Sequence, residues 1–307
     1  MWFEKYDEIT TALSKYLPWL YLCRDNIVRN KDGSLICAFI YNEIDISILK
    51  QIALSGICIW IDYNFGVKTL YIVYNPCLTD ADFGKIRSSI EKFGEFIETL
   101  ERTYNITSVK NEELIESFYR TITVNESIKM PENPIYLDYK LTKQHQYKKY
   151  QKQYLMIDDT YLQCIKLLGY PDFITKPLII FLQTNEIKFR MSRRCIFVSG
   201  NERKKEIQRY TSSWSTSHKE FLKVLRYDNS EICGYYDTLL TVYEKNIDEL
   251  TKKVTSTVKF LANCGVPTVI DKSNMGDIWY STLPGMLRSN IMAPLMEITI
   301  NKDMFFM

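Results

Sequence analysis

The sequence predicts an α+β fold in which hairpins come first and strand–helix–strand units follow. In the first half, strand-like runs are joined by short glycine-containing turns at residues 31–34 and 64–67. An Asp-Gly turn between two such runs is the strongest short-range signal of a β-hairpin. In the second half, strand-like runs alternate with helical patterns, which is typical of βαβ units. We therefore expect a hairpin-rich N-terminal subdomain followed by a split βαβ, ferredoxin-like subdomain.

The composition is that of an ordinary globular protein. The chain has 307 residues, of which 46% are hydrophobic and 14% aromatic, with 11 Gly and 9 Pro. These values exclude disordered and low-complexity classes. Because 39 Lys and Arg face 37 Asp and Glu, the formal net charge is +2, and no strong positive field would draw the chain to nucleic acid. The length predicts two domains.

The N-terminal region is expected to contain a helix, then the first hairpin, a second helix and the second hairpin. Apolar residues at helical spacing predict a short helix over residues 6–16, which Pro18 ends. Between the hairpins, residues 45–55 fit a helix with Asp45 as its N-cap.

A long amphipathic helix is expected over residues 80–104. Its apolar residues recur at alternating spacings of three and four, which is a narrow heptad seam. The seam consists of Phe83, Ile86, Ile90, Phe93, Ile97, Leu100 and Tyr104. A seam this short does not require a coiled coil, so we expect it to pack within its own domain. A shorter helix over residues 112–121 follows.

The domain boundary is expected near residue 130. Residues 125–134 break all periodicity and contain two prolines, which is typical of a linker. This placement gives an N-terminal α+β subdomain of residues 1–130 and a ferredoxin-like α+β subdomain of residues 131–307.

Strands and capped helices are expected to alternate in the second subdomain. Strands are expected at residues 160–168, 188–199, 235–243 and 266–271, and residues 174–183 fit a short helix or a buried strand. Capping boxes at Ser199 and Asn246 predict two helices, and the first of these is a long helix inserted after Ser199. Gly265 fits the position just after a helix C-terminus.

The sequence contains no motif that identifies catalytic, cofactor-binding or metal-binding residues. A P-loop needs G-x-x-x-x-G-K-[ST] to cradle phosphates, but Gly84-Lys85 is followed by Ile86 and has no glycine five residues before it. The eight cysteines form no C-x-x-C pair and two histidines accompany them, so we expect reduced core thiols and no zinc. A Cys-His nucleophilic pair that meets in space is the alternative. No apolar run reaches the roughly 18 residues of a membrane-spanning helix.

Two basic segments are candidates for binding anionic partners. Lysines and tyrosines interleave over residues 139–154, a mix that suits a nucleic acid backbone or an anionic lipid surface. We favour a solvated connector between strands for this segment. The second segment combines Arg190, Arg193 and Arg194 with Arg203, Lys204 and Lys205. Because Glu202 and Glu206 partly neutralise it, we interpret this cluster as a surface helix face with local ion pairs.

Taken in order, four segments resemble one family. Leu17–Leu35 contains L-P-W-L ahead of a hairpin with N-K-D-G-S, and Phe189–Trp214 contains an R-R-x-I-F-V strand. Tyr235–Val266 and Trp279–Leu295, the latter with L-P-G, complete the set. These segments are similar to the N-terminal domain of the CagE/TrbE/VirB family, the VirB4-type ATPases of type IV secretion and conjugation. The resemblance covers essentially the whole chain.

The resemblance implies a cytoplasmic domain at the inner face of the bacterial inner membrane, ahead of a RecA-like motor domain with the Walker motifs. The motor is absent from this chain, which stops at Met307, so ATP and Mg²⁺ would belong to the parent protein's motor. We therefore expect a non-catalytic docking and assembly domain that anchors the motor.

The expected partners are inner-membrane components of the secretion complex and other copies of the ATPase, and peripheral membrane contact fits the same placement. A module that binds the transferred nucleic acid is the alternative from another class. An independent enzyme that uses a cysteine or a carboxylate is a third.

The candidate interaction residues fall in two groups. Trp2, Phe3 and Tyr6 give the N-terminal helix an aromatic face, and exposed apolar surface marks interaction sites. The segments that carry the resemblance contribute Trp19, Arg193, Arg194, Pro284 and Gly285. For Trp19 we favour a role in the fold, sealing the N-terminal helix on the hairpin, over direct partner contact. For Pro284-Gly285 we favour a turn in which the glycine takes a positive φ.

Overall fold

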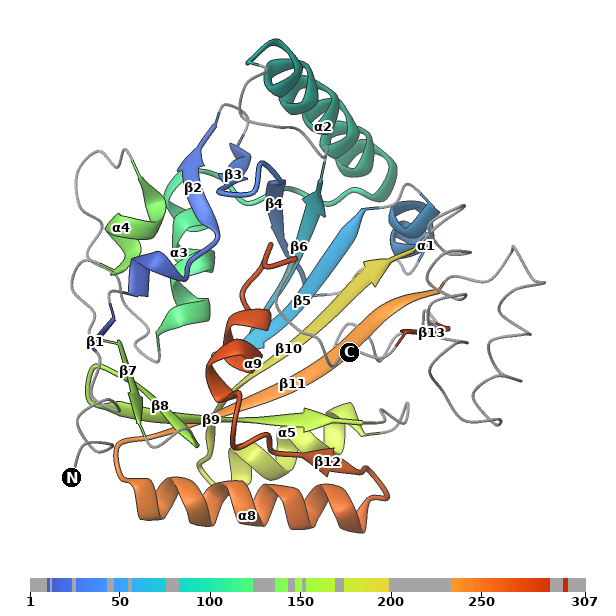
Figure 1. Cartoon of the computed structure of the whole chain (residues 1–307). Helices are drawn as coiled ribbons and strands as arrows, with labels where there is room; N and C mark the ends of the chain where they lie inside the picture. The colour runs from blue at the N-terminus through green and yellow to red at the C-terminus, as the bar shows by residue number, and fades with distance from the viewer. Residues whose placement is uncertain are drawn as a thin grey trace, which may run out of the picture.

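The computed structural model describes most of the chain. The described residues are 10–11, 13–23, 26–42, 47–54, 57–75, 83–123, 136–142, 147–150, 153–168, 174–198, 233–287 and 295–297. Within these ranges the fold is a mixed α+β structure, which confirms the predicted class (Figure 1).

The described strands form one antiparallel sheet of 13 strands. Their order is β1-β7-β8-β9-β11-β10-β5-β6-β4-β3-β2, with β12 beside β9 and β13 beside β11. Their bounds are β1 Thr10–Thr11, β2 Trp19–Leu22, β3 Val28–Asn30, β4 Leu35–Ile40, β5 Cys58–Asn64, β6 Val67–Tyr74, β7 Tyr147–Tyr150, β8 Tyr154–Ile157, β9 Thr160–Leu167, β10 Lys188–Phe197, β11 Cys233–Glu244, β12 Thr268–Val269 and β13 Leu295–Glu297. The helices are η2 Leu13–Lys15, α1 Ser47–Leu54, α2 Phe83–Tyr104, α3 Asn111–Ile122, α4 Leu137–Thr142, α5 Thr175–Thr184, α8 Ile247–Asn263 and α9 Met275–Ser281.

The sheet consists of two halves that share one topology. In the C-terminal half-sheet (β8–β12), helix α5 connects β9 to the parallel strand β10, β11 lies between them, and α8 leads to β12 beside β9. In the N-terminal half-sheet (β2–β6), helix α1 connects β4 to the parallel strand β5, and β6 lies between them. Helix α2 then leads to an isolated bridge between Ser108 and Phe39 of β4. This bridge takes the place that β12 has beside β9 in the C-terminal half-sheet.

The two halves join edge to edge through β5 and β10. These strands pair antiparallel from Arg190 opposite Asn64 to Cys195 opposite Ile59. The joint therefore relates the two strand–helix–strand units by an approximate twofold rotation. The strand–helix–strand order expected from the sequence is present in the C-terminal half, whereas its counterpart in the N-terminal half was not predicted. The division into two subdomains at residue 130 stays a prediction.

Helices cover both faces of the sheet. The crossover helices α1, α2, α5 and α8 contribute to one apolar cluster, so they cover the same face, which we name the crossover face. Helices α3, α4 and α9 contribute to a second cluster on the opposite face, which we name the α9 face. In the orientation of Figure 1, α9 lies in front of the central strands. The core is thus divided in two by a single sheet.

Most local predictions are confirmed. The two hairpins are β3–β4 and β5–β6, and Asn246 caps α8 by accepting from the backbone N–H groups of Asp248 and Glu249. Gly265 has φ +75° just after that helix. The heptad helix is α2, whose Phe93, Ile97 and Leu100 are buried in the crossover cluster, so the seam packs within the domain. Residues 174–183 belong to a helix rather than a strand.

Two local predictions are wrong where the structure describes them. The expected helix over residues 6–16 is replaced by the short strand β1, which pairs with β7, and by the 3₁₀ turn η2. The lysine–tyrosine segment is not a plain connector, because its residues 147–150 form β7 between β1 and β8. In both cases main-chain pairing with a distant strand overrides the local pattern. The helix expected after Ser199 lies outside the described residues.

Candidate functional site

Four of the predicted interaction residues converge on one place, and a fifth lies nearby on the other side of the sheet. Trp19, Arg194, Pro284 and Gly285 meet on the α9 face, above the joint between β5 and β10. Arg193 lies on the crossover face. The remaining three, Trp2, Phe3 and Tyr6, lie outside the described residues. Trp19 and Pro284 are 265 positions apart in sequence, so the convergence is a property of the fold.

The segment Ser281–Met286, which we name the strap, is the centre of this site. It begins at the last residue of α9 and crosses in front of the central strands (Figure 1). Its turns are closed by main-chain bonds from Leu283 N to Tyr280 O and from Met286 N to Leu283 O, at 3.0 and 3.1 Å. Gly285 has φ +85°. The L-P-G motif is therefore a turn with a left-handed glycine, as the sequence predicts.

The N-terminal half-sheet holds the strap through two tryptophans. The indole N–H of Trp19 donates to Pro284 O at 2.9 Å, and that of Trp60 donates to Ser281 O at 3.3 Å. Trp19 is fully buried and packs on Phe118 of α3. This favours a role in the fold for Trp19, although the ring seals α3 and the strap rather than an N-terminal helix.

Close approach of the backbone explains why position 285 carries glycine. A Cβ on Gly285 would lie 2.3 Å from Nδ2 of Asn30, which itself donates to Ser34 Oγ at 2.8 Å. Asn30 and Ser34 belong to the N-K-D-G-S hairpin. Two of the motifs that carry the family resemblance thus fit against each other.

The C-terminal half-sheet holds the strap through Arg190, which is fully buried. The guanidinium makes a bidentate pair with Asp62, with Nε to Oδ2 at 2.8 Å and Nη2 to Oδ1 at 3.1 Å. Its other bonds go to Thr121 O at 3.0 Å, Thr282 Oγ1 at 2.9 Å and Thr282 O at 2.7 Å. These five acceptors match the five N–H donors of an arginine side chain. Arg190 therefore ties β5, α3 and the strap to β10.

Burial and ion pairing have opposite effects on the pKa values of Asp62 and Arg190. Burial raises the pKa of Asp62, while the charge and hydrogen bonds of Arg190 act to lower it. For Arg190 burial acts to lower the pKa, but the charge and hydrogen bonds of Asp62 together with the nearby Tyr243 and Tyr71 outweigh it, and the pKa is raised. The arginine is therefore held in its charged form, and the carboxylate depends on it for compensation.

A second set of charged side chains, formed by Arg194, Asp237 and Lys166, lies beside the pair of Arg190 and Asp62. Arg194 donates from Nη1 to Met286 O at 3.3 Å and pairs in register with Asp237 of β11. Lys166 Nζ lies 3.3 Å from Asp237 Oδ1. Burial raises the pKa of Asp237, and the charges of Lys166 and Arg194 oppose this shift. Burial likewise lowers the pKa of Arg194, and Asp237 opposes it.

The surface-helix interpretation is wrong for the three arginines that the structure describes, whereas Arg203, Lys204 and Lys205 lie outside the described residues. Arg190, Arg193 and Arg194 lie on strand β10 and are at most 3% exposed. Since neighbouring residues of a strand point to opposite faces, Arg190 and Arg194 reach the α9 face, and Arg193 reaches the crossover face. There its Nη2 donates to Thr175 Oγ1 at 3.2 Å. The partners that compensate these charges come from distant segments, which a local charge pattern does not show.

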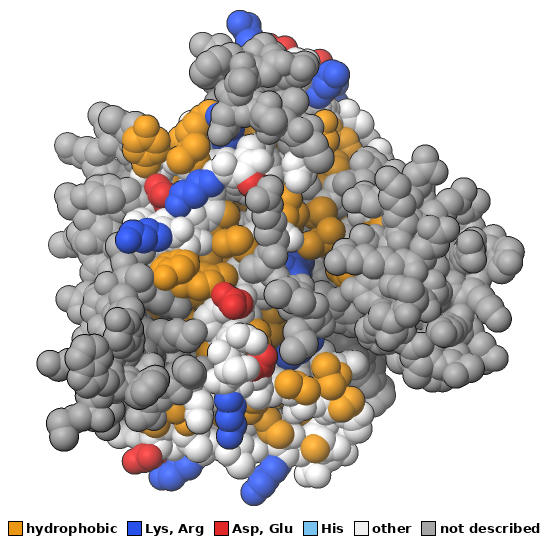
Figure 2. All heavy atoms as spheres, in the orientation of Figure 1, with side chains coloured by type: hydrophobic (Ala, Val, Ile, Leu, Met, Phe, Trp, Pro, Cys, Tyr) orange, Lys and Arg blue, Asp and Glu red, His pale blue; other side chains and the backbone are white. Residues whose placement is uncertain are grey.

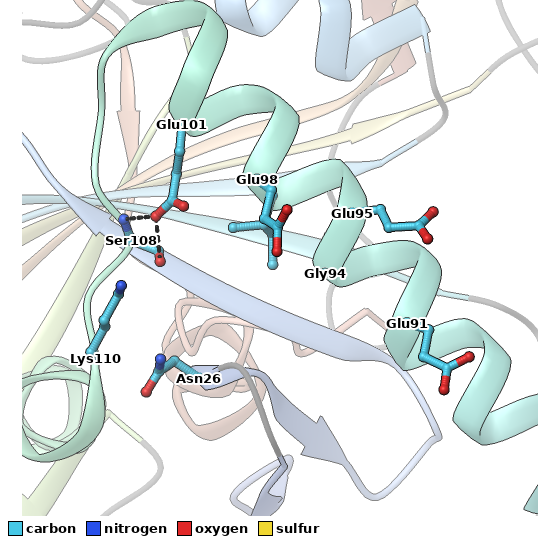
Figure 3. A pocket seen from close by; sticks show the side chains of 9 residues that line it. Asn26, Glu91, Gly94, Glu95, Glu98, Glu101, Ser108 and Lys110 are labelled. Carbon is cyan, nitrogen blue, oxygen red and sulfur yellow. Dashed lines mark hydrogen bonds between the residues drawn. The ribbon is translucent and has the colours of Figure 1, made fainter.

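An acidic groove runs along α2, away from the strap (Figure 3). Its volume is about 350 Å³. It is lined by Asn26, Glu91, Gly94, Glu95, Ile97, Glu98, Glu101, Ser108 and Lys110. Glu101 accepts from the N–H and the hydroxyl of Ser108, both at 2.7 Å. This groove is not among the predicted sites, although Glu91, Glu95 and Glu98 recur at helical spacing beside the apolar seam.

Charged side chains are dispersed on the face of the molecule drawn in Figure 2. On the face seen in Figure 2, basic and acidic side chains are scattered among hydrophobic ones rather than gathered into one patch. Among the described residues, no group of three or more His, Cys, Asp and Glu is placed to hold a metal ion. None of the helices described here has the length and apolar character needed to cross a membrane.

Comparison with known proteins identifies the family of this chain. Residues 100–292, more than half of the chain, match the model of the CagE, TrbE, VirB family, described as a component of the type IV transporter system. The chain therefore belongs to the CagE/TrbE/VirB family, as the sequence resemblance indicates. The matched region extends from the end of α2 through β10 and the strap.

A curated relative supports the same assignment. The chain is 21% identical over 198 residues to the conjugal transfer protein TrbE of Rhizobium radiobacter. This alignment covers 56% of the present chain and 24% of the relative, so the chain spans about a quarter of that protein's length.

Proposed function

We propose that this chain is a non-catalytic docking and assembly domain of a type IV secretion or conjugal transfer ATPase. In this role it would connect a motor domain to the inner-membrane part of the transporter, at its cytoplasmic face. Its partners would be inner-membrane components of the complex and other copies of the ATPase. Family membership as a type IV transporter component is the observation that carries the proposal.

The use of the family motifs inside the fold supports a platform role. Trp19, Arg194 and Gly285 serve to fix the strap on the sheet, and each is buried or half-buried. Partner contacts would then fall on other surfaces. The aromatic N-terminus with Trp2 and Phe3 is the first candidate for such contacts, and the acidic groove of α2 is the second.

Recovery of transporter components by the purified chain tests the proposal. The wild-type chain should recover inner-membrane components from detergent extracts of cells that carry the complete transporter. The variant Trp2→Ala with Phe3→Ala tests the N-terminus, and Glu95→Gln with Glu98→Gln tests the groove. Recovery of no component by the wild type would contradict a docking role, and full recovery by both variants would exclude both surfaces.

ATP turnover tests the non-catalytic part of the proposal. The 307 residues contain no G-x-x-x-x-G-K-[ST] sequence, and ATP hydrolysis by loops of this class depends on it. We expect no turnover above buffer. Turnover that follows the protein peak through repeated purification would contradict this part and leave the docking role to the recovery experiment.

A further inference from the structure

The strap is bonded to the two half-sheets in alternation. Along the strap, carbonyl oxygens accept from the N-terminal half at Ser281 and Pro284, and from the C-terminal half at Thr282 and Met286. The donors are, in the same order, Trp60, Trp19, Arg190 and Arg194. Because the anchors alternate, the strap cannot detach from one half-sheet without disturbing its bonds to the other.

Undocking of the strap would leave a buried charge incompletely bonded. Thr282 supplies two of the five acceptors of Arg190, through its hydroxyl and its carbonyl oxygen. Loss of both leaves two guanidinium N–H groups without acceptors at the joint between β5 and β10. Such groups are costly in a protein interior, and a partly bonded network is worse than a complete one. The docked strap and the intact joint therefore favour each other.

We propose that the strap is a coupling device that locks the two half-sheets together, docking and undocking as one unit with the β5–β10 joint. A displacement of either half-sheet is then transmitted to the other through the strap as well as through strand pairing. The inference rests on contacts within the chain and does not depend on the proposed docking function.

Hydrogen exchange of the wild-type chain in low urea tests the unit directly. The reporters are the strap amides of Leu283 and Met286 and the amides of the paired strands β5 and β10. Amides that open in one cooperative unit share their opening equilibrium and its urea dependence. We expect protection factors within about threefold of each other, with the same urea dependence. Strap amides that exchange about 100-fold faster, without urea dependence, would overturn the proposal.

A double-mutant cycle tests the coupling between halves. Trp19→Phe removes the bond to Pro284 O, and Ser192→Ala removes the bond from Ser192 Oγ to Thr282 O at 3.3 Å. Trp19 lies on β2 and Ser192 on β10, and four strands separate these two in the sheet order. We expect each single variant to speed strap exchange about two- to tenfold, as loss of one buried hydrogen bond does. In the double variant the increase should be smaller than the product, because a strap loosened by the first loss holds its second bond more weakly.

The control is Tyr71→Phe, which removes a buried bond from the Tyr71 hydroxyl to Ser117 O at 2.8 Å without touching the strap. Combined with Ser192→Ala it should give the product of the single effects. If Trp19→Phe and Ser192→Ala also multiply, or if neither speeds strap exchange, the coupling is refuted. Far-UV circular dichroism identifies any variant that fails to fold. In that case the exchange experiment on the wild-type chain, which needs no variant, tests the proposal.

Discussion

The crossover face and the α9 face of the same sheet are stabilised in different ways. On the crossover face, α1, α2, α5 and α8 pack on the strands through a large apolar cluster, and the buried Arg193 bonds there to the Thr175 hydroxyl of α5. The α9 face also has an apolar cluster, but two buried charged groups lie within it, around Arg190 with Asp62 and around Arg194 with Asp237. Apolar packing is tolerant of similar side chains, whereas buried ion pairs require particular partners. Described residues from all four segments that carry the family resemblance, among them Trp19, Arg194, Asp237 and Gly285, lie on the less tolerant face.

The largest expected effect is the loss of Arg190. Arg190→Met leaves Asp62 buried without its counter-charge and Thr282 without its donor, and breaking a buried pair in this way costs about 3–5 kcal/mol. Replacing both members, as Arg190→Met with Asp62→Leu, should recover part of that loss, because no uncompensated charge remains. Urea unfolding gives the free energies.

The substitution to compare with Arg190→Met is Ile61→Val on the crossover face. Ile61 is the neighbour of Asp62 on β5. Ile61 is fully buried, and this change should cost about 0.5–1.5 kcal/mol. A cost for Arg190→Met no greater than that of Ile61→Val would contradict the distinction between the faces.

The features of this fold that the sequence predicts are those determined by residues close together in the chain. The hairpins, α2 and the cap at Asn246 follow from spacing and turn residues, which neighbouring positions determine. The same information could not show that Arg190 pairs with Asp62, 128 positions away, so the sequence predicts the strand but places its arginines on the surface. The repeated strand order of the N-terminal half was likewise invisible, because crossover connections depend on which strands pair. The Pro284-Gly285 turn was predictable, but its contact with Asn30 was not.

A smaller effect is expected at Gly285, with Gly265 as a matched control. Both have positive φ, but a Cβ at Gly265 meets nothing within 4 Å, whereas one at Gly285 meets Asn30. Gly265→Ala should therefore cost about 1 kcal/mol for the backbone alone. Gly285→Ala should cost roughly 1 kcal/mol more, because Asn30 must give up its bond to Ser34. Equal costs in urea unfolding would remove the close approach from the description of the strap.

Thiol reactivity should differ between the interior and the sheet edge. Burial raises the pKa of Cys164, on the α9 face, to about 12, and that of the half-buried Cys23 to about 11. Because the thiolate is the reacting form, alkylation of native Cys23 should rise about tenfold per pH unit between pH 8 and 10, ahead of Cys164. Unfolded thiols ionise near pH 8.5, whereas these buried thiols keep their protons to higher pH. The free energy of unfolding should therefore begin to fall as the pH rises above about 8.5.

Peptide mass spectrometry after brief alkylation measures each cysteine separately, and the urea-unfolded chain is the control. Faster labelling of Cys164 than of Cys23 in the native protein would contradict the burial assigned to the α9 face.

The smallest effect is expected on the exposed side of α2. Glu98 pairs with Arg102 at 3.2 Å, and both side chains are more than half exposed. Glu98→Gln should change the free energy of unfolding by less than about 0.5 kcal/mol, since exposed helical pairs contribute little. A loss above about 1 kcal/mol would show that the acidic groove is part of the stabilising core rather than a surface feature.

The most direct test of the central claim, that the strap and the two half-sheets form one unit, is urea unfolding followed by two probes. Three of the five tryptophans, Trp19, Trp60 and Trp279, are buried in the apolar cluster of the α9 face. In a chain with Trp2→Phe and Trp214→Phe, fluorescence reports this face alone, and far-UV circular dichroism reports the whole sheet and its helices. We predict one coincident transition for the two probes. A fluorescence transition that completes at lower urea than the circular dichroism transition would show that the strap face opens separately and would contradict the claim.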